Sequence, residues 1–315
     1  MTRYVARRLA FAVFLVVAVS SASLVLTRLA PGDYATGSLG IEARRETIEQ
    51  ARARYGLNKS IAAQYGDWLA HAARFEFGNS LLYDRPVSDL VPERAANTAI
   101  LAVSGLILAT AVGLPLGIIS GARPRGVATA AIRTFSLIFL SLPPLLTSIF
   151  LVVVAARTGW FPVSGIRSSG QPDGAALDLL RHLVVPAAAL ALPLAALFER
   201  LQAQAMRETI DEPFVLAAAA RGVPRTRIVW RDALKPSLRP VASVYGLVIG
   251  ALLSGSFAVE VITSWPGLGS LMLDALRARD VYLVAGCAGA GALFLACGTL
   301  VSDLALAAVD PRARH

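Results

Sequence analysis

Six apolar runs, separated by polar and charged segments, define the hydrophobic pattern of this chain. They cover about residues 9–29, 97–121, 134–156, 183–203, 241–262 and 281–308. Each is close to the roughly 20 residues that an α-helix needs to cross the hydrocarbon core of a membrane. The fourth run contains Pro186 and Pro193, but a spanning helix tolerates proline where neighbouring helices satisfy the freed carbonyl groups. The pattern predicts an all-α membrane protein with six transmembrane helices in a single domain, residues 1–315.

The segment between the first two runs, residues 30–96, has a different, amphipathic pattern. Apolar residues recur at helical spacing on two stretches, Ile48, Ala51 and Tyr55 on the first and Ile61, Tyr65, Trp68, Leu69 and Ala72 on the second. The pattern predicts two short helices, of which Gly56 ends the first and Ser60 caps the second. A segment this short barely makes a core alone. We therefore expect its aromatic side chains to be buried against the membrane helices or a docked partner.

Composition and charge support a membrane protein and give its orientation. Hydrophobic residues make up 56% of the chain and charged residues 16%, well below the quarter that is usual in soluble domains. With the N-terminus inside, the cytoplasmic segments carry sixteen lysines and arginines and the two short outer loops carry five. The long segment 30–96 is left out of this comparison. The bias predicts a cytoplasmic N-terminus and C-terminus, and it explains the net charge of +9 without nucleic acid.

The most basic stretch, "LAAAARGVPRTRIVWRDALKPSLRP", lies within the cytoplasmic loop 204–240. The alanines favour a helix, and Gly222 can supply a left-handed turn at its end. Pro224 suits the first turn of a second helix, and Lys235-Pro236 is expected to close that helix. The stretch therefore predicts a helix, a tight turn and another helix. On pattern alone, a solvated loop whose arginines only set the topology is an equally good interpretation.

Several kinds of chemistry find no support in the sequence. No GxxxxGK[ST] motif is present, so the chain does not bind ATP through a P-loop. A membrane enzyme would need a base within the spans, and an ion-coupled carrier would need ionisable groups near the bilayer midplane. The histidines lie outside the apolar runs, and the acids within the runs lie near their ends: His71, His182 and His315, and Glu199, Glu260 and Asp303. The chain offers a path without an energy source.

The stretch "SWPGLG" follows the fifth run, and it predicts a reversal at the outer rim. Pro266, Gly267 and Gly269 disfavour a continued helix. Glu260, near the outer end of the run, would be costly facing lipid and should face protein or water. It can serve either as a structural partner of an arginine at the same rim or as a residue that lines an outer gate.

The basic stretch resembles the cytoplasmic loop of the membrane permeases of the dipeptide, oligopeptide and nickel ABC importers. Ala219 and Asp232 depart from that family, which often has a basic residue and a histidine there. The resemblance extends over essentially the whole chain. It is carried by "RLAPGD", "YGLN", "QYGDWL", "FGNS", "PVSDLVPERAANT", "EVITSWPGLGSLMLDALRARD" and "DPR", and in the loop by Ala218, Ala220, Arg221, Gly222, Ala233, Leu234 and Pro240. The long segment after the first run resembles the first of the two permease types that pair in these importers.

The resemblance implies a permease subunit of the prokaryotic cytoplasmic membrane that forms a path for short peptides. Nickel chelates, glutathione or oligosaccharides are alternative substrates, and a stand-alone secondary carrier is the alternative of a different class. The implied partners are a second permease, two cytosolic ATPases, an extracytoplasmic binding protein and the lipid bilayer. ATP and Mg would be bound by the ATPases, and no cofactor, metal or catalytic residue is expected in this chain.

The resemblance also implies two functional regions. The loop would dock in a cleft of the ATPase through Ala218, Ala220, Arg221, Gly222, Val223, Pro224, Ala233 and Leu234. The outer gate and the docking surface for the binding protein would comprise Tyr65, Trp68, Glu260, Trp265, Pro266, Gly267, Leu268, Gly269, Arg279 and Asp280.

Overall fold

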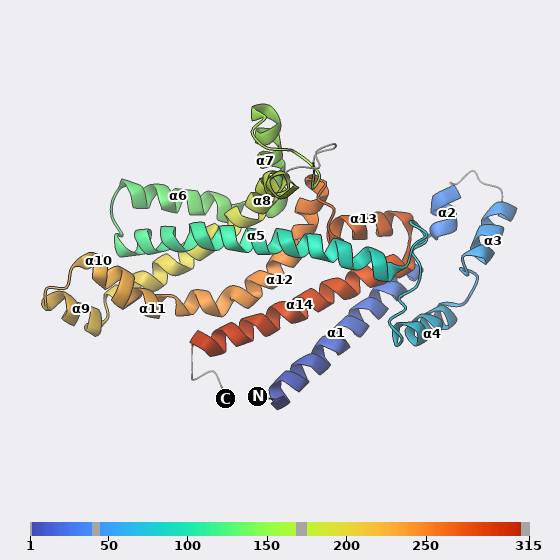
Figure 1. Cartoon of the computed structure of the whole chain (residues 1–315), viewed down its shortest axis with the longest axis horizontal. Coiled ribbons are helices and arrows are strands. Elements are labelled where there is room, and N and C mark those ends of the chain that lie inside the picture. The colour runs from blue at the N-terminus through green and yellow to red at the C-terminus, as the bar shows by residue number, and fades with distance from the viewer. Residues whose placement is uncertain (1, 40–44, 168–174, 310–315) are drawn as a thin grey trace. The chain divides into compact units, whose positions relative to one another are not determined.

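A computed structural model of the chain describes residues 2–39, 45–167 and 175–309 (Figure 1). Over these ranges the chain forms helices joined by short loops, with one isolated β-bridge between Asn79 and Pro86. The predicted all-α class is confirmed. The helices are α1 (Thr2–Leu29), α2 (Tyr34–Leu39), α3 (Arg45–Arg54), α4 (Ile61–Ala72), α5 (Val87–Ala122), α6 (Val127–Ser141), α7 (Pro144–Thr158), α8 (Ala175–Ile210), α9 (Pro213–Ala220), α10 (Arg225–Arg227), the π-helical turn η1 (Ile228–Ala233), α11 (Leu234–Ser237), α12 (Arg239–Ile262), α13 (Leu268–Ala278) and α14 (Val281–Val309).

Four helices of the described ranges are long and apolar enough to cross a membrane. They contain the segments Ala6–Leu29, Val87–Ala122, Ala176–Ile210 and Val281–Leu300. Two bent helix pairs, α6 with α7 and the two halves of α12, raise the number to six if each pair is one span. The chain is therefore an all-α membrane protein.

The third apolar run does not form the single helix that its composition predicts. Helices α6 and α7 are separated at residues 142–143, and their axes differ by 110°. Leu142 has an extended backbone, with φ −97° and ψ 119°, because the residue before a proline is disfavoured in the helical region. Pro143 is also extended, and Pro144 opens α7, where its missing N–H costs nothing. The expected span 134–156 is thus two helices with a sharp bend.

The fourth and fifth runs respond differently to their helix-disfavouring residues. Helix α8 runs without interruption through Pro186 and Pro193, as expected for a helix surrounded by other helices. Helix α12 bends by 55° between Arg239–Gly250 and Gly255–Ile262.

The chain divides into two compact units. The first comprises residues 1–99 and 266–297, and the second comprises residues 100–265 and 298–315. In the first unit, Val87 and Leu90 at the start of α5 pack with residues of α13 and α14. A smaller cluster brings Leu24 of α1 and Trp68 of α4 against Val281 and Ala285 of α14.

In the second unit, α8 lies against α5 through a row of glycines spaced four residues apart. A Cβ atom on Gly113 would lie 2.6 Å from the Ala195 carbonyl oxygen, and one on Gly117 would lie 2.7 Å from the Glu199 carbonyl oxygen. One on Gly121 would lie 2.7 Å from the Ala203 carbonyl oxygen. Small residues at this spacing let two membrane helices approach closely. The backbones of α5 and α8 are therefore in direct contact along this row.

Candidate functional site

Helix α9 begins the basic hairpin, which we define as residues 211–238 between α8 and α12. Glu212 is its N-cap, and Pro213 occupies the first helical position, which favours proline. The helix ends in a Schellman turn, in which Val223 N donates to Ala218 O at 3.2 Å and Gly222 N donates to Ala219 O at 2.9 Å. Gly222 has φ +81°, so the predicted left-handed turn is confirmed.

The second half of the hairpin differs from the prediction. Pro224 is the N-cap of α10, with ψ 141°, and does not lie inside the helix. Lys235-Pro236 does not end a helix, because α11 runs from Leu234 to Ser237 and α12 begins at Arg239. The π-helical turn Ile228–Ala233 ends three residues before this proline. Wide turns of this kind interrupt the regular bond ladder of a helix, which lets the chain continue through Pro236.

The hairpin has an apolar underside that packs on the ends of α5 and α8. Ala218 of α9 and Ala233 of the π-helical turn are buried there. The full set of buried residues is Ile118, Ala122, Met206, Val215, Ala218, Ile228, Val229 and Ala233, with Ile210, Val223 and Leu234 partly buried beside them. Of the predicted coupling residues, Ala218, Val223, Ala233 and Leu234 therefore pack inside the hairpin, whereas Ala220, Arg221, Gly222 and Pro224 are exposed.

Polar contacts tie the hairpin to the helices behind it. Arg225 Nη2 donates to the carbonyl oxygen of Ala122 at 2.7 Å, where the last turn of α5 leaves carbonyl groups without helical partners. On the other side, Gln202 of α8 donates from Nε2 to Ser237 Oγ at 2.9 Å, and both side chains are buried. Displacement of the hairpin would therefore strain contacts with both α5 and α8.

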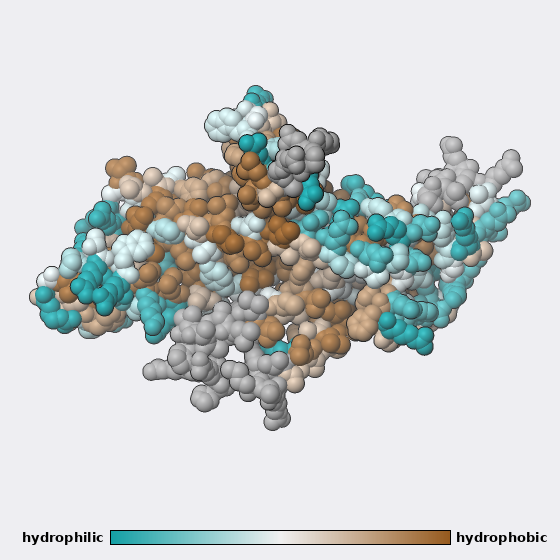
Figure 2. All heavy atoms as spheres, viewed as in Figure 1, coloured by the Kyte–Doolittle hydropathy of each residue, from teal (hydrophilic) through white to brown (hydrophobic). Residues whose placement is uncertain are grey.

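The hairpin also exposes three large apolar side chains and several arginines. Phe214 is 48% exposed, Leu216 56% and Trp230 53%. Arg221, Arg225, Arg227 and Arg231 of the same hairpin are exposed as well. Figure 2 shows hydrophilic residues gathered over α9 and α10, whereas the adjoining α5 and α6 are largely hydrophobic. Exposed aromatic and arginine side chains are enriched at protein interfaces.

These three apolar residues were not among the site residues predicted from the sequence. A sequence signal was present, since Phe214, Leu216 and Trp230 are large apolar residues in an otherwise basic segment. Which of them faced outward depended on the fold of the hairpin. Val215 and Val229, each adjacent to one of them, are buried.

The segment 30–96, which we call the outer segment after its predicted location, is organised around α4 in the first unit. Ser60 Oγ accepts from Ala63 N at 3.3 Å and caps the helix as predicted. Trp68 is 5% exposed and packs with Leu24 and Val281, and Tyr65 stacks on it with ring centroids 6.3 Å apart. The expected burial of these aromatic side chains against membrane helices is confirmed for Trp68, whereas Leu69 remains 39% exposed.

Helices α2 and α3 are held together by a charged contact. Arg52 Nε donates to Asp33 Oδ2 at 2.6 Å, and Asp33 Oδ1 also accepts from Thr36 N at 2.9 Å. Burial acts to raise the pKa of Asp33, but the hydrogen bonds from Thr36 and Arg52 outweigh it and hold the pKa below its ordinary value. The ionised carboxylate that links the two helices is thereby stabilised.

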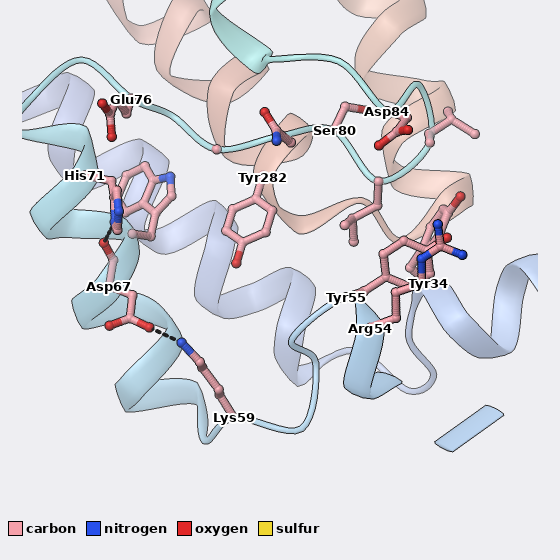
Figure 3. A pocket seen from close by; sticks show the side chains of 15 residues that line it. Tyr34, Arg54, Tyr55, Lys59, Asp67, His71, Glu76, Ser80, Asp84 and Tyr282 are labelled. Atoms are coloured by element: carbon pink, nitrogen blue, oxygen red, sulfur yellow. Dashed lines mark hydrogen bonds and ion pairs between the residues drawn. The ribbon is translucent and has the colours of Figure 1, made fainter. Parts of the chain in front are cut away.

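A polar pocket of about 660 Å³ opens in the same segment (Figure 3). Side chains of both charges line it, with Arg54 and Lys59 on one hand and Asp67, Glu76 and Asp84 on the other. Lys59 Nζ donates to Asp67 Oδ2 at 2.5 Å. This exposed ion pair contributes little to stability. The pocket gives the outer segment a polar surface of mixed charge.

The helix break predicted at "SWPGLG" is present, but its details differ. Helix α12 ends at Ile262, α13 begins at Leu268, and the left-handed residue between them is Ser264, with φ +50°. Gly267 has φ −101°, and Gly269 lies inside α13. Glycine at position 269 is therefore not a helix breaker here, because the turn is completed before it.

Two residues of α5 that were not singled out from the sequence form hydrogen bonds with Pro266 and Leu268. Asn97 Nδ2 donates to Pro266 O at 2.8 Å, and Leu268 N donates to Thr98 Oγ1 at 2.7 Å. Both contacts lie within the first unit. Asn97-Thr98 ends the stretch "PVSDLVPERAANT", so that stretch is hydrogen-bonded to the Pro266–Leu268 part of "SWPGLG".

Most of the residues predicted for the outer gate and the binding-protein docking surface are buried or partly buried. Trp265 and Glu260 are both fully buried in the second unit, which agrees with the expectation that Glu260 faces protein. Asp280 is also fully buried, and it accepts from Ser80 Oγ at 2.6 Å, Leu82 N at 3.1 Å and Leu283 N at 3.1 Å. Trp68, Gly267 and Leu268 are buried as well, whereas Tyr65, Pro266, Gly269 and Arg279 are partly exposed. Direct contact with a binding protein is therefore not supported for the buried residues.

Comparisons with known proteins cover almost the whole chain. A family model described as "Binding-protein-dependent transport system inner membrane component" matches residues 113–315, and a model of the N-terminal part of such components matches residues 1–102. The chain is 30% identical to the oligopeptide transport system permease protein AppB of Bacillus subtilis, over 100% of both chains. It is 31% identical to a putative peptide permease protein of Brucella ovis and to a probable peptide ABC transporter permease protein of Sinorhizobium fredii, over 99% of each chain. Helices apolar enough to span a membrane, together with matches from end to end, show that the chain belongs to the inner-membrane components of binding-protein-dependent transport systems.

Proposed function

We propose that this chain is the peptide-conducting permease of an ABC importer, in which it pairs with a second, homologous permease. Two cytosolic ATPases bind ATP and Mg and supply the energy, and an extracytoplasmic protein delivers the substrate. The relatives' names, which refer to peptide and oligopeptide transport, support short peptides as the substrate. This chain itself has no catalytic role and holds no cofactor.

The basic hairpin is the contact with the ATPase. The observation that supports this proposal most is the exposure of three large apolar side chains on the hairpin. Phe214, Leu216 and Trp230 are about half exposed although the rest of the hairpin builds its own apolar core. A partner that covers these three side chains would gain roughly 25 cal/mol for each Å² of apolar surface removed from water. The surrounding arginines would fix its orientation, since interface charges act mainly on register and specificity.

The hairpin can transmit movement because it is tied to two membrane helices. A force on α9 reaches α5 through Arg225 and Ala122, and it reaches α8 through Ser237 and Gln202. Helices α5 and α8 contact each other along their glycine row. We infer that they move together when the ATPases close, as in rigid-body switching between two states.

The orientation follows from the bias in basic residues. Cytoplasmic termini and a cytoplasmic hairpin place sixteen lysines and arginines inside and five in the short outer loops. The outer segment 30–96 then faces the binding protein. The polar pocket that Arg54 and Glu76 help to line offers the exposed, mixed-charge surface that a soluble partner can contact.

Reconstitution with the partner subunits tests this function. The chain, the second permease, the ATPases and the binding protein are assembled in lipid vesicles, and uptake of labelled di- to pentapeptides is followed together with ATP hydrolysis. Peptide uptake should require ATP, the binding protein and both permeases. Uptake by this chain alone, driven by an ion gradient, would identify a secondary carrier, and uptake by a homodimer with the ATPases would contradict the paired permeases.

A further inference from the structure

A second cleft in the second unit, between α6 and α8, is not explained by the proposed function. It has a volume of about 190 Å³. From α6 it is lined by Arg133, Ser136, Leu137 and Leu140, and from α8 by Glu199, Arg200, Ala203 and Arg207. Its walls thus combine arginines, a hydroxyl group, a carboxylate and apolar side chains.

The arginines of this cleft converge from two helices. Arg200 and Arg207 are seven residues apart on α8, which places them on one face, about 10.5 Å apart along the axis. Arg133 belongs to the opposite helix. Within the described ranges, none of the three arginines forms an ion pair with a carboxylate. With three arginines and one glutamate in its lining, the cleft carries an excess of cationic groups.

Two further groups in the cleft bear on what it can bind. Glu199 is buried, and its Oε1 accepts from Ser120 Oγ at 2.5 Å, so three cationic side chains face one engaged carboxylate. Ser136 is 5% exposed, and its Oγ has no hydrogen-bond partner among the residues that the structure describes. A buried hydroxyl without a partner is unfavourable, and an anionic oxygen in the cleft would accept from it.

The apolar part of the cleft continues onto the surface of α6. Leu137 is 61% exposed and Leu140 38%, and Ile138 beside them is 51% exposed. In a membrane these side chains contact acyl chains. A ligand that fills the cleft thus needs an anionic head next to an apolar tail.

The cleft lies near the hairpin end of the membrane helices, which is where a lipid headgroup of the cytoplasmic leaflet would lie. Arg207 is three residues from the end of α8 at Ile210, where the basic hairpin begins. Arg225 of that hairpin bonds to Ala122, five residues before the start of α6. The cleft is therefore near the hairpin end of the unit. Its assignment to the cytoplasmic leaflet rests on the orientation of the proposed function.

We propose that the α6–α8 cleft binds the phosphate of an anionic phospholipid from the cytoplasmic leaflet. Arg133, Arg200 and Arg207 contact the phosphate oxygens, the Ser136 hydroxyl donates to one of them, and Leu137 and Leu140 contact the first part of an acyl chain. Basic pockets between membrane helices on this side bind such headgroups.

Native mass spectrometry of the full-length chain in a neutral detergent tests the site. Phosphatidylglycerol and phosphatidylethanolamine are titrated separately, because they differ in net headgroup charge. We expect phosphatidylglycerol to bind about tenfold more tightly. The double variant Arg133→Gln/Arg207→Gln should lose about tenfold in affinity for phosphatidylglycerol and little for phosphatidylethanolamine. Arg227→Gln/Arg231→Gln, which removes the same charge from the hairpin surface, should bind as the unchanged chain does.

Several outcomes would overturn the proposal. An equal loss of phosphatidylglycerol affinity in the cleft variant and the hairpin variant would show that the lipid is held only by non-specific attraction to positive charge. Displacement of phosphatidylglycerol by an equal concentration of inorganic phosphate would show a site for soluble anions. Loss of ATPase binding with unchanged lipid affinity would make the cleft a protein interface. Thermal unfolding without added lipid should be the same for all variants. The single variant Arg133→Gln changes an exposed position and should lower the affinity for phosphatidylglycerol about threefold. If the double variant is unstable, this single variant carries the test. Lipid affinity is measured without transport, so this result is independent of the peptide-uptake result.

Discussion

Replacement of Gly222 by valine is expected to reduce coupled transport about tenfold while the chain stays folded and paired in the membrane. Gly222 has φ +81° and closes the Schellman turn between α9 and α10. A left-handed backbone costs a residue with a Cβ atom roughly 1–2 kcal/mol, a factor of about 5–30 in the population of this turn. The exposed face of α9 would then no longer be held in one orientation. Peptide uptake and peptide-stimulated ATP hydrolysis in vesicles should fall about tenfold.

Asparagine at the same position separates backbone conformation from bulk. A Cβ built on Gly222 meets no atom within 4 Å beyond its chain neighbours, so the position has room for a first side-chain atom. Asparagine adopts the left-handed conformation far more readily than valine. Gly222→Asn should therefore keep most of the uptake. Normal coupled uptake by Gly222→Val would remove the hairpin from the mechanism.

Replacement of Gly117 is expected to have the largest effect on folding. A Cβ at this position would lie 2.6 Å from Gln202 Cβ and 2.7 Å from the Glu199 carbonyl oxygen. Neither atom can rotate away, because one is backbone and the other is attached directly to it. Overpacking typically costs about 1–3 kcal/mol. Gly117→Ala should lower the thermal midpoint, and Gly117→Leu should prevent recovery of a single folded species in detergent.

Gly291 is the matched control for this prediction. It is also a glycine within a long apolar helix, but a Cβ atom added to it would have no other atom within 4 Å. Alanine is favoured over glycine in a helix by about 1 kcal/mol, so Gly291→Ala should keep or raise the midpoint. A similar loss in both variants would mean that helix propensity, and not the contact between α5 and α8, decides stability.

The local features of the fold were predictable because they depend on residues close together in the sequence. The Ser60 cap, the Gly222 turn and the position of five apolar helices follow from short-range pattern. The break at Leu142-Pro143 was also a local signal, since two prolines follow each other there, but the apolar composition of 134–156 outweighed it. The glycine row 113–117–121 was visible at a spacing of four. Its partner helix was not.

The site was harder to predict, because exposure depends on packing between distant segments. Ala218 and Ala233 carry the resemblance to known permeases, yet they lie inside the hairpin. Trp265 and Asp280 stand in a stretch that implied docking, yet both are fully buried. In each case the sequence motif marks residues that build the element, while the residues that can touch a partner are their neighbours. Asn97 and Thr98 were missed for the same reason, as their contacts lie about 170 residues away.

Site-specific photocrosslinking from the hairpin tests the central claim most directly. A photoreactive residue is placed at Leu216, which is 56% exposed, or at the adjacent Val215, which is 2% exposed, and the assembled importer is illuminated in membrane vesicles. We expect a crosslink to the ATPase from position 216, none from position 215, and a weaker crosslink from position 216 when Gly222 is replaced by valine. A crosslink from position 216 to the extracytoplasmic binding protein, or none to the ATPase in a complex that hydrolyses ATP during uptake, would contradict the account.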